Sequence, residues 1–162
     1  MIDAKQSMTS KLDKYVTRLL RSFVIQRTQT VALRDEADFI QKLYDYTYTQ
    51  HRLKPTTLFC SIKITNYSTL DTHENLIDTV TYFLTDNSVN YAIGHVPISI
   101  VKNLLQLFLY NNLFSYNNKL YRFIKGSPST LALSDLLSNI YLCVWQKSIL
   151  KEVERHREFF GR

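Results

Sequence analysis

Apolar and polar residues alternate along this chain of 162 residues with two different periods. In several stretches, apolar residues recur every three or four positions, which is the spacing of an amphipathic helix. This spacing predicts helices over residues 10–26, from 35 or 36 to about 49, from 71 or 72 to about 86–88, from 97 to 109, and from about 131 into the charged stretch that follows Lys147.

Two other stretches have the pattern of strands. Residues 56–65 are rich in β-branched and aromatic side chains, and apolar residues occupy every second position. Residues 113–116 and 119–124 flank Asn117 and Asn118, and asparagine tolerates the positive φ of a tight hairpin turn. The resulting order is helix, helix, strand, helix, helix, hairpin, helix. It predicts an α+β fold with helices packed on a small, mainly antiparallel sheet.

Composition points to a single basic domain. The formal net charge is +6 and the sequence pI is about 9.3. This charge favours an acidic partner, of which nucleic acid is the commonest, although an ordinary basic surface also explains it. The N-terminus lacks the apolar core of a signal peptide, and no apolar run approaches membrane-spanning length. We therefore expect an intracellular protein, nuclear or cytoplasmic, with no membrane partner.

Several kinds of chemistry find no support in the residue pattern. Cys60 and Cys143 lie in apolar runs without zinc-site spacing, so we expect both to be reduced core residues. The four histidines are scattered, and there is no phosphate-binding glycine loop or nucleophile elbow. An independent enzyme of these classes is not indicated.

The order of four short motifs resembles a reverse transcriptase. They are Pro-Thr-Thr-Leu-Phe-Cys-Ser at 55–61, His-Glu-Asn-Leu at 73–76, Tyr-Arg through Gly-Ser-Pro at 121–128, and Leu-Ser-Asn-Ile-Tyr-Leu at 137–142. From about residue 12 to 162 the chain is most similar to the retrotransposon proteins of Penelope-like and bdelloid-rotifer-type elements. The resemblance implies a fingers-like helical segment over 1–55 and an incomplete palm over 56–162, in one continuous unit.

The resemblance also implies a degenerate active site. RNA-directed DNA polymerases of this family use aspartates to hold two magnesium ions for nucleotidyl transfer. Lys63 stands where the first aspartate is expected, and an ammonium group cannot bind magnesium. The chain also reaches residue 162 before the aromatic-x-Asp-Asp strand that carries the other carboxylates. We therefore expect no intact catalytic residue and no cofactor, with magnesium relevant only if a longer product or a separate chain completes the palm.

Other positions correspond to the substrate-binding parts of the family. Tyr67 lies near the place of the aromatic residue that screens the nucleotide sugar, one residue early, with Ser68 in the expected slot. Asp71 fits a helix cap or a solvated acid better than a substitute metal ligand. The resemblance assigns nucleic-acid contacts to Arg18, Arg21, Arg122, Lys125, Gly126, Ser127 and Asn139.

Each of these contacts also has a purely structural explanation. Arg18 and Arg21 also fit a solvated basic helix face, and the Gly-Ser-Pro segment also fits a simple turn before a helix. Asn139 can bond neighbouring backbone instead of a ligand. Tyr141 and Trp145 can stack on bases but at helical spacing are more often core residues.

The expected function is that of a reverse transcriptase-like fragment that binds RNA or an RNA–DNA duplex without catalysis. A second hypothesis is a protein-interaction or oligomerising module that uses an uncovered palm edge and has no nucleic-acid role. A third hypothesis is an enzyme that further sequence completes. A fourth is a retroelement remnant with no selected function.

Overall fold

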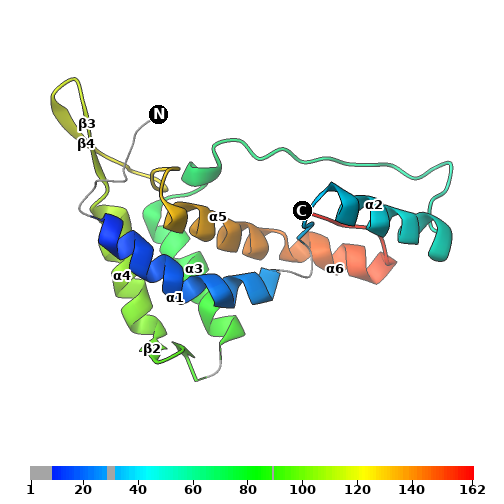
Figure 1. Cartoon of the computed structure of the whole chain (residues 1–162), viewed down its shortest axis with the longest axis horizontal. Coiled ribbons are helices and arrows are strands. Elements are labelled where there is room, and N and C mark those ends of the chain that lie inside the picture. Colours follow the sequence, from blue (N-terminus) through cyan, green and yellow to red (C-terminus); the bar gives the residue numbers. More distant parts are fainter. Residues whose placement is uncertain (1–8, 29–31, 89) are drawn as a thin grey trace.

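The computed structural model describes residues 9–28, 32–88 and 90–162 (Figure 1). The helices are α1 Ser10–Thr28, α2 Glu36–Tyr44, α3 His73–Asn87, α4 Ile98–Tyr110, α5 Ala132–Trp145 and α6 Lys147–His156, with a π-helical turn η1 Asp45–Thr49 and a 3₁₀ turn η2 Tyr67–Thr69. The strands are β1 Ala92–Ile93, β2 Val96–Pro97, β3 Leu113–Tyr116 and β4 Lys119–Arg122. Among the described residues, no helix is both long enough and apolar enough to cross a membrane.

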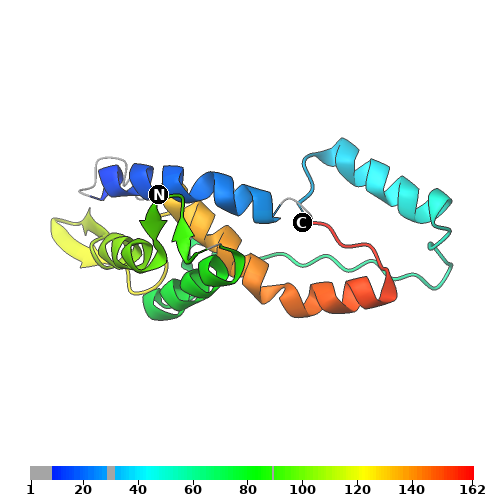
Figure 2. The ribbon, with the colours of Figure 1, turned by 90° about the horizontal axis from the view of Figure 1, so that it is seen from below.

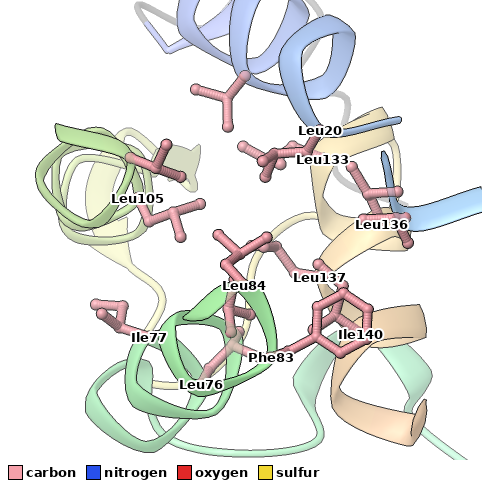
Figure 3. Close-up of a cluster of buried hydrophobic side chains, with 14 of the residues drawn as sticks. Leu20, Leu76, Ile77, Phe83, Leu84, Leu105, Leu133, Leu136, Leu137 and Ile140 are labelled. Atoms are coloured by element: carbon pink, nitrogen blue, oxygen red, sulfur yellow. The ribbon is translucent and has the colours of Figure 1, made fainter. Parts of the chain in front are cut away.

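Four helices, α1, α3, α4 and α5, enclose the main hydrophobic core. Figure 3 shows Leu20 of α1, Leu84 of α3, Leu105 of α4 and Leu137 of α5 converging on one another. Each of these side chains is fully or almost fully buried. Burying one leucine stabilises a fold by roughly 1.5–3 kcal/mol. The core therefore ties α1 to the three helices that follow it much later in the chain.

The predicted helices are confirmed, with one difference near the C-terminus. Thr72, one of the two predicted caps of α3, accepts a hydrogen bond from the backbone N–H of Asn75 at 3.3 Å. The predicted long final helix is divided at Gln146 into α5 and α6. The backbone of Gln146 has φ −77° and ψ −6°, which departs from α-helical geometry, although its N–H still donates to Leu142 O at 2.9 Å.

The predicted hairpin is also confirmed. Strands β3 and β4 pair antiparallel, and the turn residues Asn117 and Asn118 have φ of 48° and 56°. Phe114 pairs with Tyr121, and their rings stack with centroids 5.5 Å apart. Strand β4 ends at Arg122, two residues earlier than expected. A second, shorter antiparallel pair, β1 with β2, turns around Gly94 and was not predicted.

The fold mixes helices with small antiparallel sheets, and the β1–β2 pair contacts the helical core through Ile93 and Val96. The prediction of a strand over residues 56–65 is wrong, because this segment is extended and irregular. β-propensity measures how well side chains fit a pleated neighbour, and no described strand pairs with this segment. Cys60 is consequently exposed, contrary to its predicted core position, whereas Cys143 is buried as expected.

A second group of elements extends from the four-helix core. Figure 2 shows α2, α6, residues 50–66 and the C-terminal residues on the same side of the bundle. The backbone N–H of Leu33 donates to Arg162 O at 2.7 Å, which joins the segment before α2 to the end of the chain. The Phe159 ring packs against Phe39 and Tyr46, with centroids 5.9 and 6.3 Å apart. The last residues are thereby held against α2 and η1.

Candidate nucleic-acid interface

A basic groove runs along the outer side of α1. It has a volume of about 530 Å³ and is formed by residues 13–25 of α1 and the beginning of α5. Its lining includes Lys14, Thr17, Arg18 and Arg21, together with Ala132 from α5. Positions 14, 18 and 21 are separated by four and three residues, so their side chains share one face of the helix. We call Lys14, Arg18 and Arg21 the α1 cations.

The α1 cations have no acidic partner within the described parts of the chain. All three side chains are exposed, and none forms an ion pair with a described residue. Like charges three or four residues apart on a helix destabilise it slightly, so an anion in the groove relieves a repulsion that the fold leaves in place. Elsewhere, Lys102 binds Asp78 at 3.0 Å and Lys147 binds Asp86 at 2.8 Å.

Asp13, the acid that lines the same groove, is already engaged in a bond within the fold. Asp13 is buried, and its carboxylate accepts a hydrogen bond from the backbone N–H of Leu133 at 2.8 Å. This bond satisfies one of the amide groups left unpaired at the start of α5. Thr17, beside Asp13 in the groove wall, has a buried hydroxyl with no hydrogen-bond partner among the described residues. The groove therefore presents three cations, and the one acid in its lining, Asp13, is buried and already bonded to α5.

Arg122 and Lys125 lie on another element, at the end of the β3–β4 hairpin. Both side chains are exposed. Arg122 is the last residue of β4, and Lys125 forms a short antiparallel bridge with Thr72 at the start of α3. Neither residue lines the α1 groove. The structure thus places the four predicted cationic contacts in two separate groups.

Gly126 and Ser127 are packed inside the molecule. Gly126 has φ +55°, and a Cβ atom on it would overlap the carbonyl oxygen of Ser68. The Gly126 N–H donates to Asp71 O at 3.1 Å, and the Ser127 N–H donates to Ser68 O at 3.0 Å. The Ser127 hydroxyl donates to Ser134 Oγ at 2.6 Å. These bonds give the glycine and the serine a structural role, and nucleic-acid contacts of the two residues stay a prediction.

His73 holds the same loop from the side of α3. It is buried, and its Nε2 lies 2.7 Å from Gly126 O. A carbonyl oxygen only accepts hydrogen bonds, so Nε2 carries the proton and donates it. Burial lowers the pKa of His73 below its ordinary value, with the positive charge of Arg122 adding to this and the bond to Gly126 opposing it. A neutral imidazole is therefore part of the folded structure.

The side chains of Asn139 and Tyr141 both form hydrogen bonds within the fold. Asn139 is half-buried, and its Nδ2 donates to Asp135 O at 3.1 Å. The Tyr141 hydroxyl donates to Asp71 Oδ2 at 3.1 Å. Trp145, by contrast, is 49% exposed and is not a core residue. Of the aromatic residues considered as stacking platforms, Trp145 offers the larger exposed surface.

Lys63 and Tyr67 occupy different environments. Lys63 is exposed on the extended segment 56–65. Tyr67 opens η2, and its carbonyl oxygen accepts a hydrogen bond from Ser138 Oγ at 2.8 Å. Burial raises the pKa of Tyr67 to about 12, with the negative charge of Asp135 adding to the effect and Arg162 opposing it. The phenol is therefore neutral at physiological pH.

The residues near these two positions do not fit a magnesium site. Lys63 supplies a cation instead of an oxygen ligand. Both Asp71 oxygens are engaged, with Thr72 N–H and Asn75 Nδ2 on Oδ1 at 2.7 and 3.1 Å and Tyr141 on Oδ2. Burial raises the pKa of Asp71, but these bonds and the charge of Lys125 outweigh it and lower the pKa overall. Within the described ranges, no cluster of three or more potential metal ligands is found.

Residue by residue, the structure brings part of the predicted site together. The backbone of Ser68 and Asp71 accepts hydrogen bonds from Ser127 and Gly126. Ser138 of α5 donates a hydrogen bond to the carbonyl oxygen of Tyr67 in the same loop. Arg18 and Arg21 lie apart, in the α1 groove. Sequence reasoning left Lys14 and Thr17 out of the site, although their positions on the same face as Arg18 and Arg21 were available as a signal. Comparisons with protein-family models, curated proteins and solved structures find no match to this chain.

Proposed function

We propose that this chain is a reverse transcriptase-like domain fragment that binds the phosphate backbone of RNA or an RNA–DNA duplex along α1 without polymerising nucleotides. The observation that supports binding is the unpaired set of α1 cations beside a groove. Lysine and arginine gain affinity for nucleic acid by releasing the counterions condensed on its phosphates. Cations already paired with acids, such as Lys102 and Lys147, have less to gain from the same contact.

The geometry of α1 suits a row of phosphates. Lys14 and Arg21 are seven residues apart, which is about 10 Å along a helix axis. Their long side chains extend the reach further, and phosphate contacts of this kind position a nucleic acid without reading its sequence. The preference for RNA or an RNA–DNA duplex comes from the motif order of the sequence and not from the groove.

The proposed lack of polymerisation rests on Lys63 and on the absence of an aromatic-x-Asp-Asp motif from residues 1–162. A polymerase needs oxygen ligands for its magnesium ions, and a lysine repels the cations instead. We expect no magnesium-dependent primer extension by the purified chain, before or after the substitution Lys63→Asp. Robust extension by the unaltered chain would show that its chemistry is intact and that this part of the proposal is wrong.

Binding is tested with three labelled probes of equal length: an RNA–DNA primer-template, a DNA duplex of the same sequence and an unstructured polyphosphate. Fluorescence anisotropy of the folded chain should show the tightest binding for the RNA–DNA probe. Equal, weak binding to all three probes would mean that the chain attracts anions nonspecifically and has no preference for RNA–DNA. No binding to any of them would remove the nucleic-acid role.

Two triple variants separate the groove from net charge. Lys14→Gln, Arg18→Gln and Arg21→Gln remove the α1 cations, while Lys42→Gln, Lys102→Gln and Lys147→Gln remove three charges that are paired with acids elsewhere. We expect the first variant to lose on the order of tenfold or more in affinity and the second about threefold or less, because paired lysines release fewer counterions. Equal losses would place the attraction in overall charge and not in α1.

A further inference from the structure

The segment 58–65 has the side chains of a strand but no backbone partner. A hydrogen bond from Thr57 N–H to Lys54 O at 2.9 Å closes a turn just before it. From residue 58 to 65, no backbone N–H or C=O is bonded to another residue in the described part of the chain. An unpaired extended backbone of this kind is a ready template for an added strand.

The side chains of this segment are unusually exposed for their type. Leu58, Phe59 and Ile62 are 94, 69 and 60% exposed. Exposed single apolar residues are common, but several on one extended segment form a patch that marks an interaction surface. Covering these side chains supplies the apolar burial that makes pairing of a strand favourable in water.

A groove lies directly beside the segment. It has a volume of about 830 Å³, and the segment forms one of its walls. The opposite lining includes Leu142 and Trp145 of α5, Ile149 of α6 and Phe159 of the C-terminal residues. A peptide that pairs with residues 58–65 can therefore place apolar side chains into the same groove.

The charges around the groove select the partner. Residues 51–65 contain Lys54, Lys63, Arg52 and His51 but no acidic residue. Arg52 is already engaged, with Nη1 2.9 Å from His156 O and 3.8 Å from the Glu158 carboxylate. Lys54 and Lys63 are exposed and have no ion pair with a described residue. Lys54 lies before the turn that precedes the segment and Lys63 lies near its far end, so the two cations flank Leu58, Phe59 and Ile62.

We propose that residues 58–65 accept an extended peptide of a partner protein by β-strand addition, with apolar residues at the centre of the peptide and acidic residues near both ends. Backbone hydrogen bonds along the segment supply the pairing, and the groove accepts the alternate apolar side chains. Lys54 and Lys63 attract the acidic ends. A second copy of this chain is the less suitable occupant, because its corresponding segment carries the same positive charges.

Synthetic nonapeptides test this proposal. The probe is fluorescein-labelled Asp-Glu-Val-Thr-Val-Thr-Val-Glu-Asp, the charge control has lysine at its four acidic positions, and the strand control has proline at its central valine. We expect the acidic probe to bind at least tenfold tighter than either control. Hydrogen exchange of the amides of residues 58–64 should slow at least tenfold when the probe binds.

Variants of the protein locate the binding. Ile62→Pro removes one N–H of the segment and should weaken binding of the acidic probe at least tenfold, whereas Ile62→Ala keeps the N–H and should weaken it less. Lys63→Glu should reverse the preference between the acidic and lysine peptides, and Lys102→Glu on α4 should not. Melting temperatures matching that of the unaltered chain verify that the variants are folded.

Four outcomes would overturn the proposal: no saturable binding of the acidic probe, equal binding of the acidic and lysine peptides, unchanged exchange at residues 58–64, or a dimer that forms through the segment and is lost in Ile62→Pro. The last result would make a second copy the occupant. Peptide binding should persist when the α1 cations are replaced, so this proposal and the nucleic-acid proposal can fail independently.

Discussion

The Asp13 carboxylate accepts a hydrogen bond from the backbone N–H of Leu133 at 2.8 Å, across 120 residues of sequence. The bond gives α5 a capping side chain that its own N-cap residue, Leu131, cannot provide. It also fixes α1, and with it the α1 groove, against the beginning of α5. Because α5 is capped by a side chain of α1, the same bond stabilises the core and positions the candidate interface.

Replacing Asp13 tests this coupling. Asp13→Ala should lower the free energy of unfolding by about 1–2 kcal/mol, because it leaves the Leu133 N–H buried without an acceptor. Asp13→Asn retains an acceptor oxygen and should lose less. Urea unfolding measures both, with Lys11→Ala on the exposed side of α1 as a control expected to change stability by less than about 0.5 kcal/mol. If Asp13→Ala behaved like the control, the tertiary cap would have no energetic role.

Two glycines with the same backbone conformation allow a matched comparison. Gly126 has φ +55° and Gly94 has φ +60°, so alanine strains the backbone at both positions. Gly94 has open space around the added Cβ, whereas the Cβ at Gly126 would overlap the Ser68 backbone. Gly94→Ala should cost about 1 kcal/mol.

Gly126→Ala should cost about 3 kcal/mol or more, because the packed loops must also move apart. Denaturant unfolding of both variants measures the difference. A similar loss at the two positions would show that the close approach of Gly126 to Ser68 does not constrain the fold. If Gly126→Ala does not accumulate as folded protein while Gly94→Ala does, the expected order is upheld.

His73 makes stability depend on pH. Its pKa is lowered in the folded chain, mainly because burial disfavours the charged ring, so the unfolded chain takes up a proton at higher pH than the folded chain. The contribution of neutral His73 is fully present above its unfolded value of about 6.5 and is lost as the pH falls below that value towards the folded pKa.

The change His73→Gln keeps a side-chain donor but removes the titration. The unaltered chain should lose more stability than His73→Gln between pH 7.5 and pH 5.5 in matched urea titrations. If the fold does not hold the histidine neutral, the free energy of unfolding of the two proteins should change in parallel with pH. Direct titration of the imidazole by NMR provides an independent measurement of the His73 pKa.

The Tyr46 hydroxyl donates to Glu158 Oε2 at 2.5 Å and helps to hold the C-terminal residues. This bond raises the pKa of Tyr46, with burial and the Glu158 charge acting in the same direction and Arg52 opposing. Tyr46→Phe should lower the free energy of unfolding by about 1 kcal/mol and speed amide exchange at the Leu33 N–H, which donates to Arg162 O. Tyr48→Phe, at an exposed ring, is the control and should change neither quantity.

Local signals predicted much of the fold. The stripes around Leu20, Leu84 and Leu105 were sufficient for α1, α3 and α4, because burial of one helix face imposes a period of about 3.6 residues. Asn117 and Asn118 predicted the hairpin, because few other residues accept positive φ at two successive positions. These elements depend on interactions within a few residues.

Features that depend on distant residues were not predicted. Residues 56–65 have strand composition, but a strand forms only with a partner, which periodicity does not reveal. The cap from Asp13 to Leu133 and the burial of Ser127 arise from contacts between remote segments. For the same reason, Arg18 and Arg21 were predicted from the sequence as binding residues, but the groove that they share with Thr17 was not predicted.

The salt dependence of binding tests the central claim, that the α1 cations contact nucleic-acid phosphates. The dissociation constant for the RNA–DNA primer-template should be measured from 50 to 300 mM salt for the unaltered chain and for the variant without the α1 cations. Each lost phosphate contact should reduce the steepness of log affinity against log salt by roughly 0.7–0.9, so replacing three cations should reduce it by about 2–3. An unchanged slope would contradict a role of α1 in binding phosphates.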